Sequence, residues 1–395
     1  RSPSRGLGDV YKRQDLYHSG ARVLVSLPAL FMSANLPSTL VTTMLIPVKK
    51  FTLREKPMIV KAIQGYLSAA LLTASVATVA APISPADYQR VVDEAYAQFK
   101  DEKGGANADY IPILATVPSE MFGVVIITRD GEVYSAGELD YEFSIQSVSK
   151  PFTASLIMQQ QGPRAVREKI GVEPTGMAFN SKMALEIYEG RSVNPLVNAG
   201  AIAAVSLVEA SSEKDRWQQV LSNIEDYTAR DLTVLEEVYD SEYETAWGNR
   251  AIANLLFNYG RLYSEPEEAL RVYTRQCSIG INTLDLAMMG ATLANEGVNP
   301  KTGKRVLDRE HVPELLAIMA TAGFYDESGE WMYSAGLPAK TGVGGGIVAV
   351  VPGKFAIATF SPPLNPAGNS VRGLKAIGYI SSTLGVGLYG PNAGE

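Results

Sequence analysis

The stretch Phe143-Ser144-Ile145-Gln146-Ser147-Val148-Ser149-Lys150 places a serine and a lysine three positions apart, directly before Pro151. Proline is tolerated in the first turn of a helix, so a helix is predicted to open near Ser147. On that helix Lys150 lies one turn from Ser147, within reach of its hydroxyl. A desolvated lysine can accept a proton from a hydroxyl, and the free N–H groups of a helix start favour an oxyanion. The stretch therefore predicts a serine nucleophile activated by a lysine.

A second motif, Lys340-Thr341-Gly342, leads through a run of glycines into a strand pattern. Serine acyl-transfer enzymes combine an S-x-x-K turn with a K-T-G strand beside it. The same letters occur at Lys301-Thr302-Gly303, but that copy follows Asn-Pro and precedes Lys-Arg, which indicates an exposed turn. Either motif alone occurs by chance, since S-x-x-K also fits an ordinary helix start with a surface lysine. The pair together favours serine hydrolase chemistry.

Strand patterns occur at both ends of the region around these motifs, and helical patterns fill residues 152–319 between them. A capped helix and a hairpin come first, and two strands and a last helix come at the end. The predicted helix starts are Ser84 and Asn369 or Ser370, and the predicted strands cover 124–128, 133–134, 346–351 and 355–360. We therefore predict an α+β fold in which an antiparallel sheet is built from both ends of the domain around a large helical insertion.

The composition limits the kinds of function that the chain can have. It has 395 residues, 46% of them hydrophobic and 19% charged, with a mean hydropathy of +0.02, which is typical of a globular protein. A net charge of −7 lacks the basic bias of nucleic-acid binders, so we expect no nucleic-acid partner. One cysteine and two histidines leave little for a metal centre or a histidine-dependent triad. We expect chemistry without metal or imidazole.

The charge is distributed unevenly along the chain. Residues 1–61 carry 10 Lys and Arg against 3 Asp and Glu, whereas the remainder carries 25 against 39. The segment Asp9-Val10-Tyr11-Lys12-Arg13-Gln14 looks like a translated sequencing adaptor, which would not belong to the natural protein. We therefore predict two parts: residues 1–81, a non-native, adaptor-like part that includes a candidate signal or leader segment, and residues 82–395, the catalytic domain.

Residues 58–81 also have the order of a secretory signal. Lys61 is followed by the apolar stretch 66–79, and Val79-Ala80-Ala81 has the small residues of a cleavage site. An upstream read-through region or an N-terminal helix fits the same letters. No run elsewhere reaches the ~18 apolar residues that a membrane-spanning helix needs, so we predict no stable membrane span.

Five segments together resemble the bacterial serine-dependent glutaminases, a family that shares the fold of serine β-lactamases and penicillin-binding proteins. They occur in the family's order between about Tyr88 and Leu388. The segments are Asp109-Tyr110-Ile111-Pro112, Phe143 to Lys150, Asn194-Pro195-Leu196-Val197-Asn198-Ala199-Gly200-Ala201, Tyr273-Thr274-Arg275-Gln276-Cys277-Ser278 and Gly336 to Gly346. The resemblance implies a β-lactamase/transpeptidase-like fold.

The resemblance also implies roles for individual residues. The catalytic residues would be Ser147 as nucleophile, Lys150 as its activating partner and Tyr325 as an acid/base. The N–H groups of Ser147 and Val343 would form an oxyanion hole. The substrate-binding residues would be Tyr110, Gln146, Ser147, Asn198, Glu242, Asn249, Tyr273, Tyr325 and Val343. Glu242 and Asn249 share one face if residues 241–253 form a helix, although an exposed helix would carry the same letters. Thr341 replaces the family's usual serine and keeps a hydroxyl.

The function implied is hydrolysis of L-glutamine to L-glutamate and ammonia, without metal or organic cofactor. A carboxylate for the substrate ammonium and neutral donors for its carboxylate suit a free amino acid. The alternatives are a β-lactamase or D-Ala-D-Ala peptidase, and a non-catalytic glutamine-sensing domain. Family members form homodimers or homotetramers in the cytoplasm, so we expect the same here, with export to the periplasm as the alternative if residues 58–81 are a signal peptide.

Overall fold

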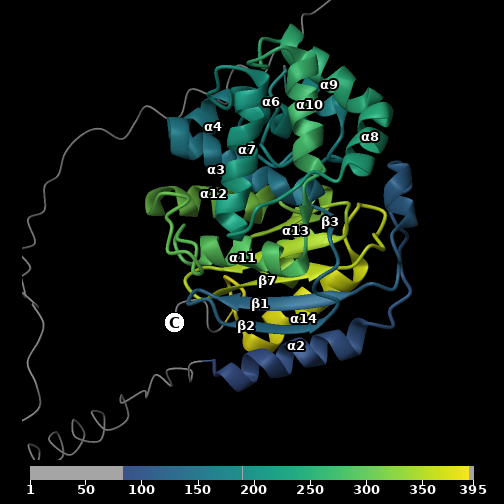
Figure 1. Cartoon of the computed structure of the whole chain (residues 1–395), viewed down its shortest axis with the longest axis vertical. Helices are drawn as coiled ribbons and strands as arrows, with labels where there is room; N and C mark the ends of the chain where they lie inside the picture. The colour runs from purple at the N-terminus through teal and green to yellow at the C-terminus, as the bar shows by residue number, and fades with distance from the viewer. Residues whose placement is uncertain (1–82, 189, 391–395) are drawn as a thin grey trace, which may run out of the picture. The chain divides into compact units, whose positions relative to one another are not determined.

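The computed structural model describes residues 83–188 and 190–390 (Figure 1). Chain contacts divide the protein into two units, Arg1–Val76 and Ala77–Glu395, and all described residues belong to the second. The adaptor-like segment, the signal-like segment and the predicted boundary at 81/82 lie outside the described residues. No helix in the described ranges is long and apolar enough to cross a bilayer.

The main sheet has five antiparallel strands in the order β2-β1-β7-β6-β5. The strands are β1 (Gly123–Thr128), β2 (Val133–Gly137), β5 (Ala339–Thr341), β6 (Gly346–Val351) and β7 (Phe355–Phe360). The first two form the predicted hairpin, and Gly131 takes a positive φ of 90° in its turn. Strand β1 pairs along its full length with β7, from Gly123 opposite Phe360 to Thr128 opposite Phe355. The prediction of a sheet built from both ends of the domain is confirmed.

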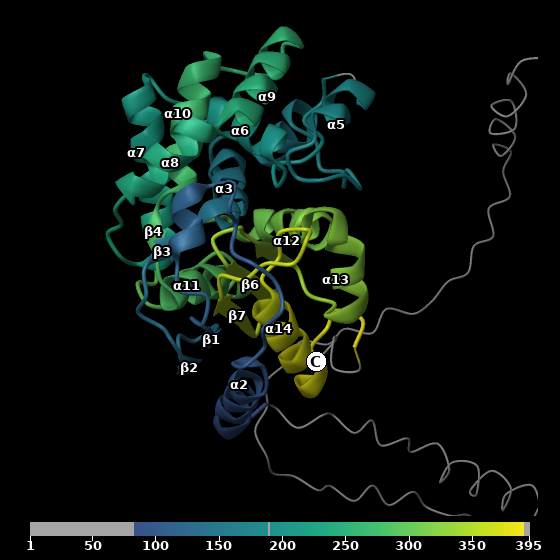
Figure 2. The same ribbon diagram turned by 90° about the vertical axis from the view of Figure 1, so that its right-hand side faces the viewer.

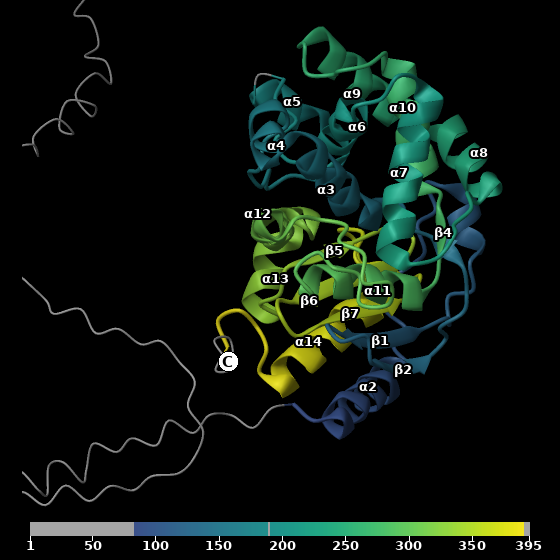
Figure 3. The ribbon, with the colours of Figure 1, turned by 60° about the vertical axis from the view of Figure 1, so that its left-hand side comes forward.

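Helices cover both faces of this sheet. Figure 3 shows α11 (Thr283–Ala294) on one side and α2 (Pro85–Phe99) and α14 (Val371–Leu384) on the other. Side chains alternate between the faces, as expected for a strand with both faces buried: Val125 packs on the α11 side and Val124 on the α14 side. Ser84 caps α2 and Ser370 caps α14, as predicted. Gly290 lets α11 approach closely, because a Cβ there would lie 2.6 Å from Ala356 Cβ.

Along the chain, a run of helices lies between the hairpin β1–β2 and the strands β5 to β7, as predicted. These helices form a layer of their own (Figure 2). Its inner helices are α3 (Lys150–Gln161), α6 (Asn198–Leu207) and α10 (Pro266–Cys277), and every residue of α6 is buried. The surrounding helices are α4 (Pro163–Lys169), α5 (Lys182–Ile187), α7 (Glu213–Thr228), α8 (Glu236–Thr245) and α9 (Trp247–Asn258). A two-stranded sheet, β3 (Phe143–Ser144) with β4 (Gly280–Ile281), joins this layer to α11. Helices α12 (Val312–Ala322) and α13 (Ser328–Ser334) lead back to β5.

Candidate active site

The serine and lysine lie on one continuous turn at the base of the helical layer. Ser147 lies in a short 3-10 helix, Gln146–Ser149, and Lys150 begins α3 with its backbone N–H donating to the Ser147 carbonyl. Pro151 occupies the first turn of α3, as predicted. Ser147 is 5% exposed and Lys150 is 1% exposed. Gln146 takes a φ of +47°, an unfavourable value for a residue with a side chain, and such strain is common at functional sites.

The Lys150 side chain is held by an asparagine from the neighbouring helix. In the part of the chain that the structure describes, Nζ donates its hydrogen bond to Asn198 Oδ1 at 2.6 Å rather than to Ser147. Nζ also lies 5.7 Å from the centroid of the Tyr273 ring. Burial lowers the pKa of Lys150 to about 8, because an ammonium loses its hydration there. The neutral amine is therefore accessible near physiological pH.

Tyr325 reaches the site from the turn that precedes α13. It begins the 3-10 turn Tyr325–Glu327 with a φ of +59°, and Ser328 Oγ donates to its carbonyl at 2.9 Å. Its hydroxyl lies 3.4 Å from the Thr341 carbonyl, to which it donates. Burial raises the pKa of Tyr325, while a hydrogen bond with the Ser147 side chain acts in the opposite direction. Burial therefore favours the neutral, protonated phenol.

Glu242 supplies a buried carboxylate beside the serine turn. Its Oε2 accepts a 2.9 Å hydrogen bond from Gln146 Nε2. Burial raises the pKa of Glu242 to about 7, whereas the Gln146 hydrogen bond and Lys150 act to lower it. A ligand ammonium would restore the lost solvation, so the site is suited to a positively charged group.

Glu242 and Asn249 reach the site from two helices. The condition under which they would share one helix face, a continuous helix over 241–253, is not met, because the chain breaks at Ala246, which ends α8 and precedes α9. The break turns Asn249 toward Asn198, whose Nδ2 donates to Asn249 Oδ1 at 2.9 Å. Both asparagines therefore still contribute to the same site.

The glycine run after the K-T-G motif packs against the serine turn. A Cβ at Gly344 would lie 2.4 Å from the Ser144 carbonyl oxygen, and one at Gly342 would lie 2.9 Å from Val148 Cγ2. Only glycine permits this approach of two backbones. The approach brings the Val343 backbone to the cavity beside Ser147. The other copy of the motif, at Lys301, is an exposed turn, as predicted.

A cavity of about 190 Å³ collects most of the residues singled out from the sequence. Eight of them line it: Tyr110, Gln146, Ser147, Asn198, Glu242, Asn249, Tyr273 and Val343. Tyr110 is 52% exposed, so its side chain remains partly open to solvent. Lys150 and Tyr325 do not line it, but Lys150 donates to Asn198 and the ring of Tyr325 packs against that of Phe179, and both of these partners do line it. The residues that the sequence analysis assigned to the site therefore lie in or next to one cavity.

Three further residues belong to this site although the sequence analysis did not assign them to it. Phe179 lines the cavity and its ring centroid lies 4.7 Å from that of Tyr325, and Asn180 lines the cavity beside it. Lys340 was singled out by its motif but not assigned to the site, and it is buried under Tyr325. Residues 176–181 are an irregular loop whose letters resemble any turn, so only the folded chain reveals their place.

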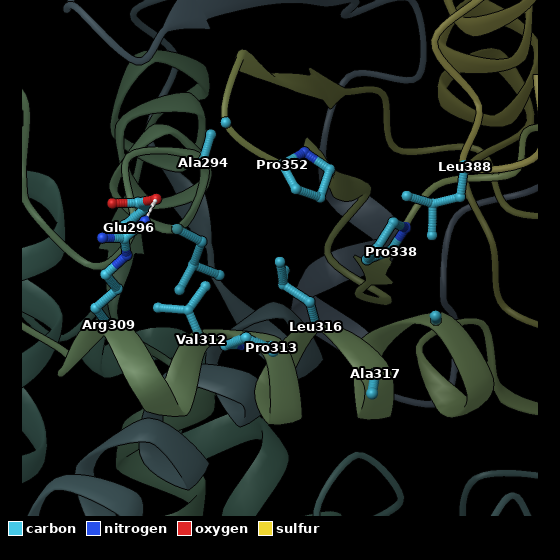
Figure 4. A pocket seen from close by; sticks show the side chains of 13 residues that line it. Ala294, Glu296, Arg309, Val312, Pro313, Leu316, Ala317, Pro338, Pro352 and Leu388 are labelled. Atoms are coloured by element: carbon cyan, nitrogen blue, oxygen red, sulfur yellow. Dashed lines mark hydrogen bonds and ion pairs between the residues drawn. The ribbon is translucent and has the colours of Figure 1, made fainter. Parts of the chain in front are cut away.

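A second hollow, of about 520 Å³, lies elsewhere, among α11, α12, the turn between β6 and β7, and Leu388 (Figure 4). Its walls are mainly apolar, with Val312 and Leu316 from α12. Its two charged residues, Glu296 and Arg309, pair with each other at 2.8 Å. It holds no serine, tyrosine or unpaired charge that could act on a substrate. Among the described residues no group of His, Cys, Asp or Glu could hold a metal ion.

The antiparallel sheet built from both ends of the domain, with its helical insertion, places the protein among the enzymes of the β-lactamase-like fold. The glutaminase family model matches residues 105–389. The chain belongs to the glutaminase family.

Curated relatives and solved structures agree with this assignment. A glutaminase of Mycobacterium ulcerans is 52% identical over 307 residues, which cover 78% of this chain and 96% of the relative. A solved probable glutaminase, ybaS, superposes with a TM-score of 0.77 at 50% identity and covers 78% of this chain and 99% of its own. A solved probable glutaminase from Bacillus subtilis complexed with 6-diazo-5-oxo-L-norleucine has a TM-score of 0.69 at 29% identity. The match covers 79% of this chain and 98% of the relative.

Proposed function

We propose that the chain hydrolyses L-glutamine to L-glutamate and ammonia. The observation that carries this proposal is the convergence of Ser147, Asn198 and Glu242 around one small cavity in a chain of the glutaminase family. The relative complexed with 6-diazo-5-oxo-L-norleucine binds an amino-acid ligand, which supports a substrate of the same class. The family match favours this function over the β-lactamase and peptidase alternatives.

The cavity is suited to one free amino acid. At about 190 Å³ it is smaller than the roughly 300–1,000 Å³ of sites for larger ligands. Glu242 would accept the substrate ammonium, and its raised pKa would fall as that pair forms. Asn249 and Tyr273 would donate to the substrate carboxylate. The side-chain amide would then face Ser147.

The reaction would begin with transfer of the Ser147 proton to Lys150, with Tyr325 as the hydrogen-bonded neighbour of the serine. Ser147 Oγ attacks the amide carbon, and the oxyanion accepts from the N–H groups of Ser147 and Val343. The amide nitrogen takes a proton from Tyr325 or Lys150, and the C–N bond breaks to release ammonia. Water then hydrolyses the glutamyl ester and returns the proton to Ser147.

Ammonia release from glutamine tests the function directly. The full chain should release ammonia from glutamine and leave nitrocefin intact, and Ser147→Ala should remove the glutamine activity. Nitrocefin cleavage would support the lactamase alternative. Tight glutamine binding without turnover, measured by calorimetry, would support the sensing domain instead.

We further propose that the chain assembles as a homodimer or homotetramer, as expected from its family, and that residues 82–395 form the catalytic domain. Light scattering after size-exclusion chromatography would give the mass of the assembly, and a monomer at micromolar concentration would refute the first proposal.

We place the enzyme in the cytoplasm. N-terminal sequencing of the natural protein tests this, because cleavage after Ala81 would show export.

A further inference from the structure

A chain of three hydrogen bonds joins helices α3 and α10 to the serine turn. Thr153 Oγ1 donates to Gln276 Oε1 at 2.6 Å, and Gln276 Nε2 donates to Ser149 Oγ at 2.9 Å. Ser149 Oγ in turn donates to the Gln146 carbonyl at 2.6 Å. Thr153, Ser149 and Gln276 are at most 2% exposed, and none of them lines the cavity. A bond lost from this chain would therefore leave a buried polar group without its partner.

The last bond of the chain acts on the peptide group that precedes the serine. The Gln146 carbonyl and the Ser147 N–H belong to the same planar group, in which they point in opposite directions. Holding the carbonyl toward Ser149 therefore also fixes the direction of the Ser147 N–H. This group needs support, because the φ of +47° at Gln146 is strained for a residue with a side chain.

We propose that Gln276 is a positioning residue that, through Ser149, holds the peptide group between Gln146 and Ser147 with its N–H aimed at the oxyanion. The inference rests on the proposed function, because it takes the Ser147 N–H as an oxyanion donor. Gln276 does not line the cavity. It acts through the serine turn and not on the substrate.

A glutamine side chain is suited to this position because an amide accepts at one end and donates at the other. Thr153 occupies the Oε1 end, so the Nε2 end faces Ser149. The Ser149 hydroxyl accepts that bond and turns its own hydrogen to the Gln146 carbonyl. The three bonds therefore run in one direction, and each polarises the next. Tyr273 lies one turn earlier on α10 and lines the cavity, so one helix carries both a wall of the site and the support of the serine turn.

The test is a double-substitution cycle in the full chain, with kcat and KM for glutamine measured at a temperature where every variant is folded. Gln276→Met removes both ends of the amide at similar volume, and Ser149→Ala removes the hydroxyl. Each should lower kcat by about 10- to 100-fold with KM within about 2-fold, since an oxyanion donor acts mainly in the transition state.

The double variant should lie within about 3-fold of the less active single variant, because both substitutions break the same chain of bonds. Losses that multiply in the double variant, or a KM effect without a kcat effect, overturn the inference.

Thr274→Val is the matched control on α10. Thr274 is fully buried and donates to the Leu270 carbonyl at 2.9 Å, so the substitution removes a buried hydrogen bond that has no part in the chain. It should lower the melting temperature and leave kcat within about 2-fold. A kcat loss as large as that of Gln276→Met would overturn the inference, because any weakening of α10 would then have the same effect.

A second substitution keeps the test decisive. If Gln276→Met does not fold, Thr153→Val replaces it in the cycle under the same criteria, since it removes the donor that orients the amide. An inactive wild-type chain would refute the proposed function and this inference with it. An active wild type with undiminished kcat in either single variant would refute this inference alone.

Discussion

Gln146 Nε2 donates a 2.9 Å hydrogen bond to Glu242 Oε2 and so joins the strained serine turn to helix α8. The two residues are far apart in sequence, yet one bond links the turn that carries Ser147 to the buried carboxylate. The positive φ of Gln146 is maintained in part by this partner. Any change at Glu242 is therefore expected to affect substrate binding and the serine turn together.

Glu242→Gln should raise KM for glutamine by about 10- to 100-fold, because a charge-assisted bond to the substrate ammonium is lost. The same substitution should stabilise the free protein by about 1–3 kcal/mol at pH 8. The pKa of Glu242 is about 7 in the folded chain against its usual 4.5, so folding stability declines as pH rises between these values. Thermal unfolding at pH 8 and pH 4.5 should show the advantage only at the higher pH.

Glu244→Gln is the matched control for this prediction, because Glu244 is exposed on the same helix. It should leave both KM and thermal stability close to wild type. An unchanged KM in Glu242→Gln would contradict the assignment of Glu242 to the substrate ammonium.

The pH dependence of turnover should follow Lys150 and Glu242. In the proposed mechanism the active form has a neutral Lys150, whose pKa is about 8, so kcat should rise with pH and level off above that value. Below about pH 7 Glu242 becomes protonated, so kcat/KM should fall more steeply than kcat. Initial rates between pH 5.5 and 9.5 would show both limbs.

Replacing Lys150 should abolish the rise in kcat near pH 8. Lys150→Met is expected to lower kcat by about 10²- to 10⁴-fold, the usual range for loss of a general base. Lys214→Met, on the exposed face of α7, is the control and should keep the full profile. A wild-type rate that is flat between pH 6 and pH 9 would argue against Lys150 as the base.

Gly344→Ala should damage the oxyanion site. Its Cβ would lie 2.4 Å from the Ser144 carbonyl oxygen, so the loop carrying Val343 must move away from Ser147. Loss of one oxyanion donor costs roughly 10²- to 10³-fold in kcat, and we expect a loss near that range. Gly329→Ala, where nothing lies within 4 Å of the added methyl, should behave as wild type. Equal rates for the two variants would exclude Val343 from the oxyanion hole.

Gly290→Ala tests the packing of α11 on the sheet. The added methyl would meet Ala356 Cβ and Val348 Cγ2, each at 2.6 Å, in a fully buried layer. Overpacking of this kind destabilises by about 1–3 kcal/mol, which chemical denaturation would measure. Gly378→Ala in α14 has open space around the methyl and should be neutral or stabilising, since alanine favours helix. A Gly290→Ala variant as stable as wild type would contradict the close packing.

Local sequence signals predicted the elements of the sheet well. Asp130-Gly131 specified the hairpin, and Ser84 with Asp87 forms a capping box at the start of α2. Strand patterns at both ends of the domain were enough to predict a shared sheet, because unpaired strands need partners. These features depend on residues close together in sequence, which is why they could be predicted.

Contacts between distant segments could not be predicted in the same way. The break at Ala246 has no proline to mark it, and the nearby Gly248 lies inside the first turn of α9 and not at the break. The positive φ of Tyr325 is unusual for a tyrosine and follows from its surroundings. Resemblance to a family located Tyr325 and Glu242, whereas the hydrogen bonds that orient them became visible only in the folded chain.

The pairing of β1 with β7 also constrains how the chain is made. Residues 123–128 leave the ribosome long before residues 355–360, which are their partners on one edge. At about 5–20 residues per second, the N-terminal hairpin waits more than ten seconds with that edge open. Such non-local pairing slows folding, and an open apolar edge invites association with other chains. A nascent chain stalled before residue 355 should therefore depend on chaperones, although its helical insertion is already complete.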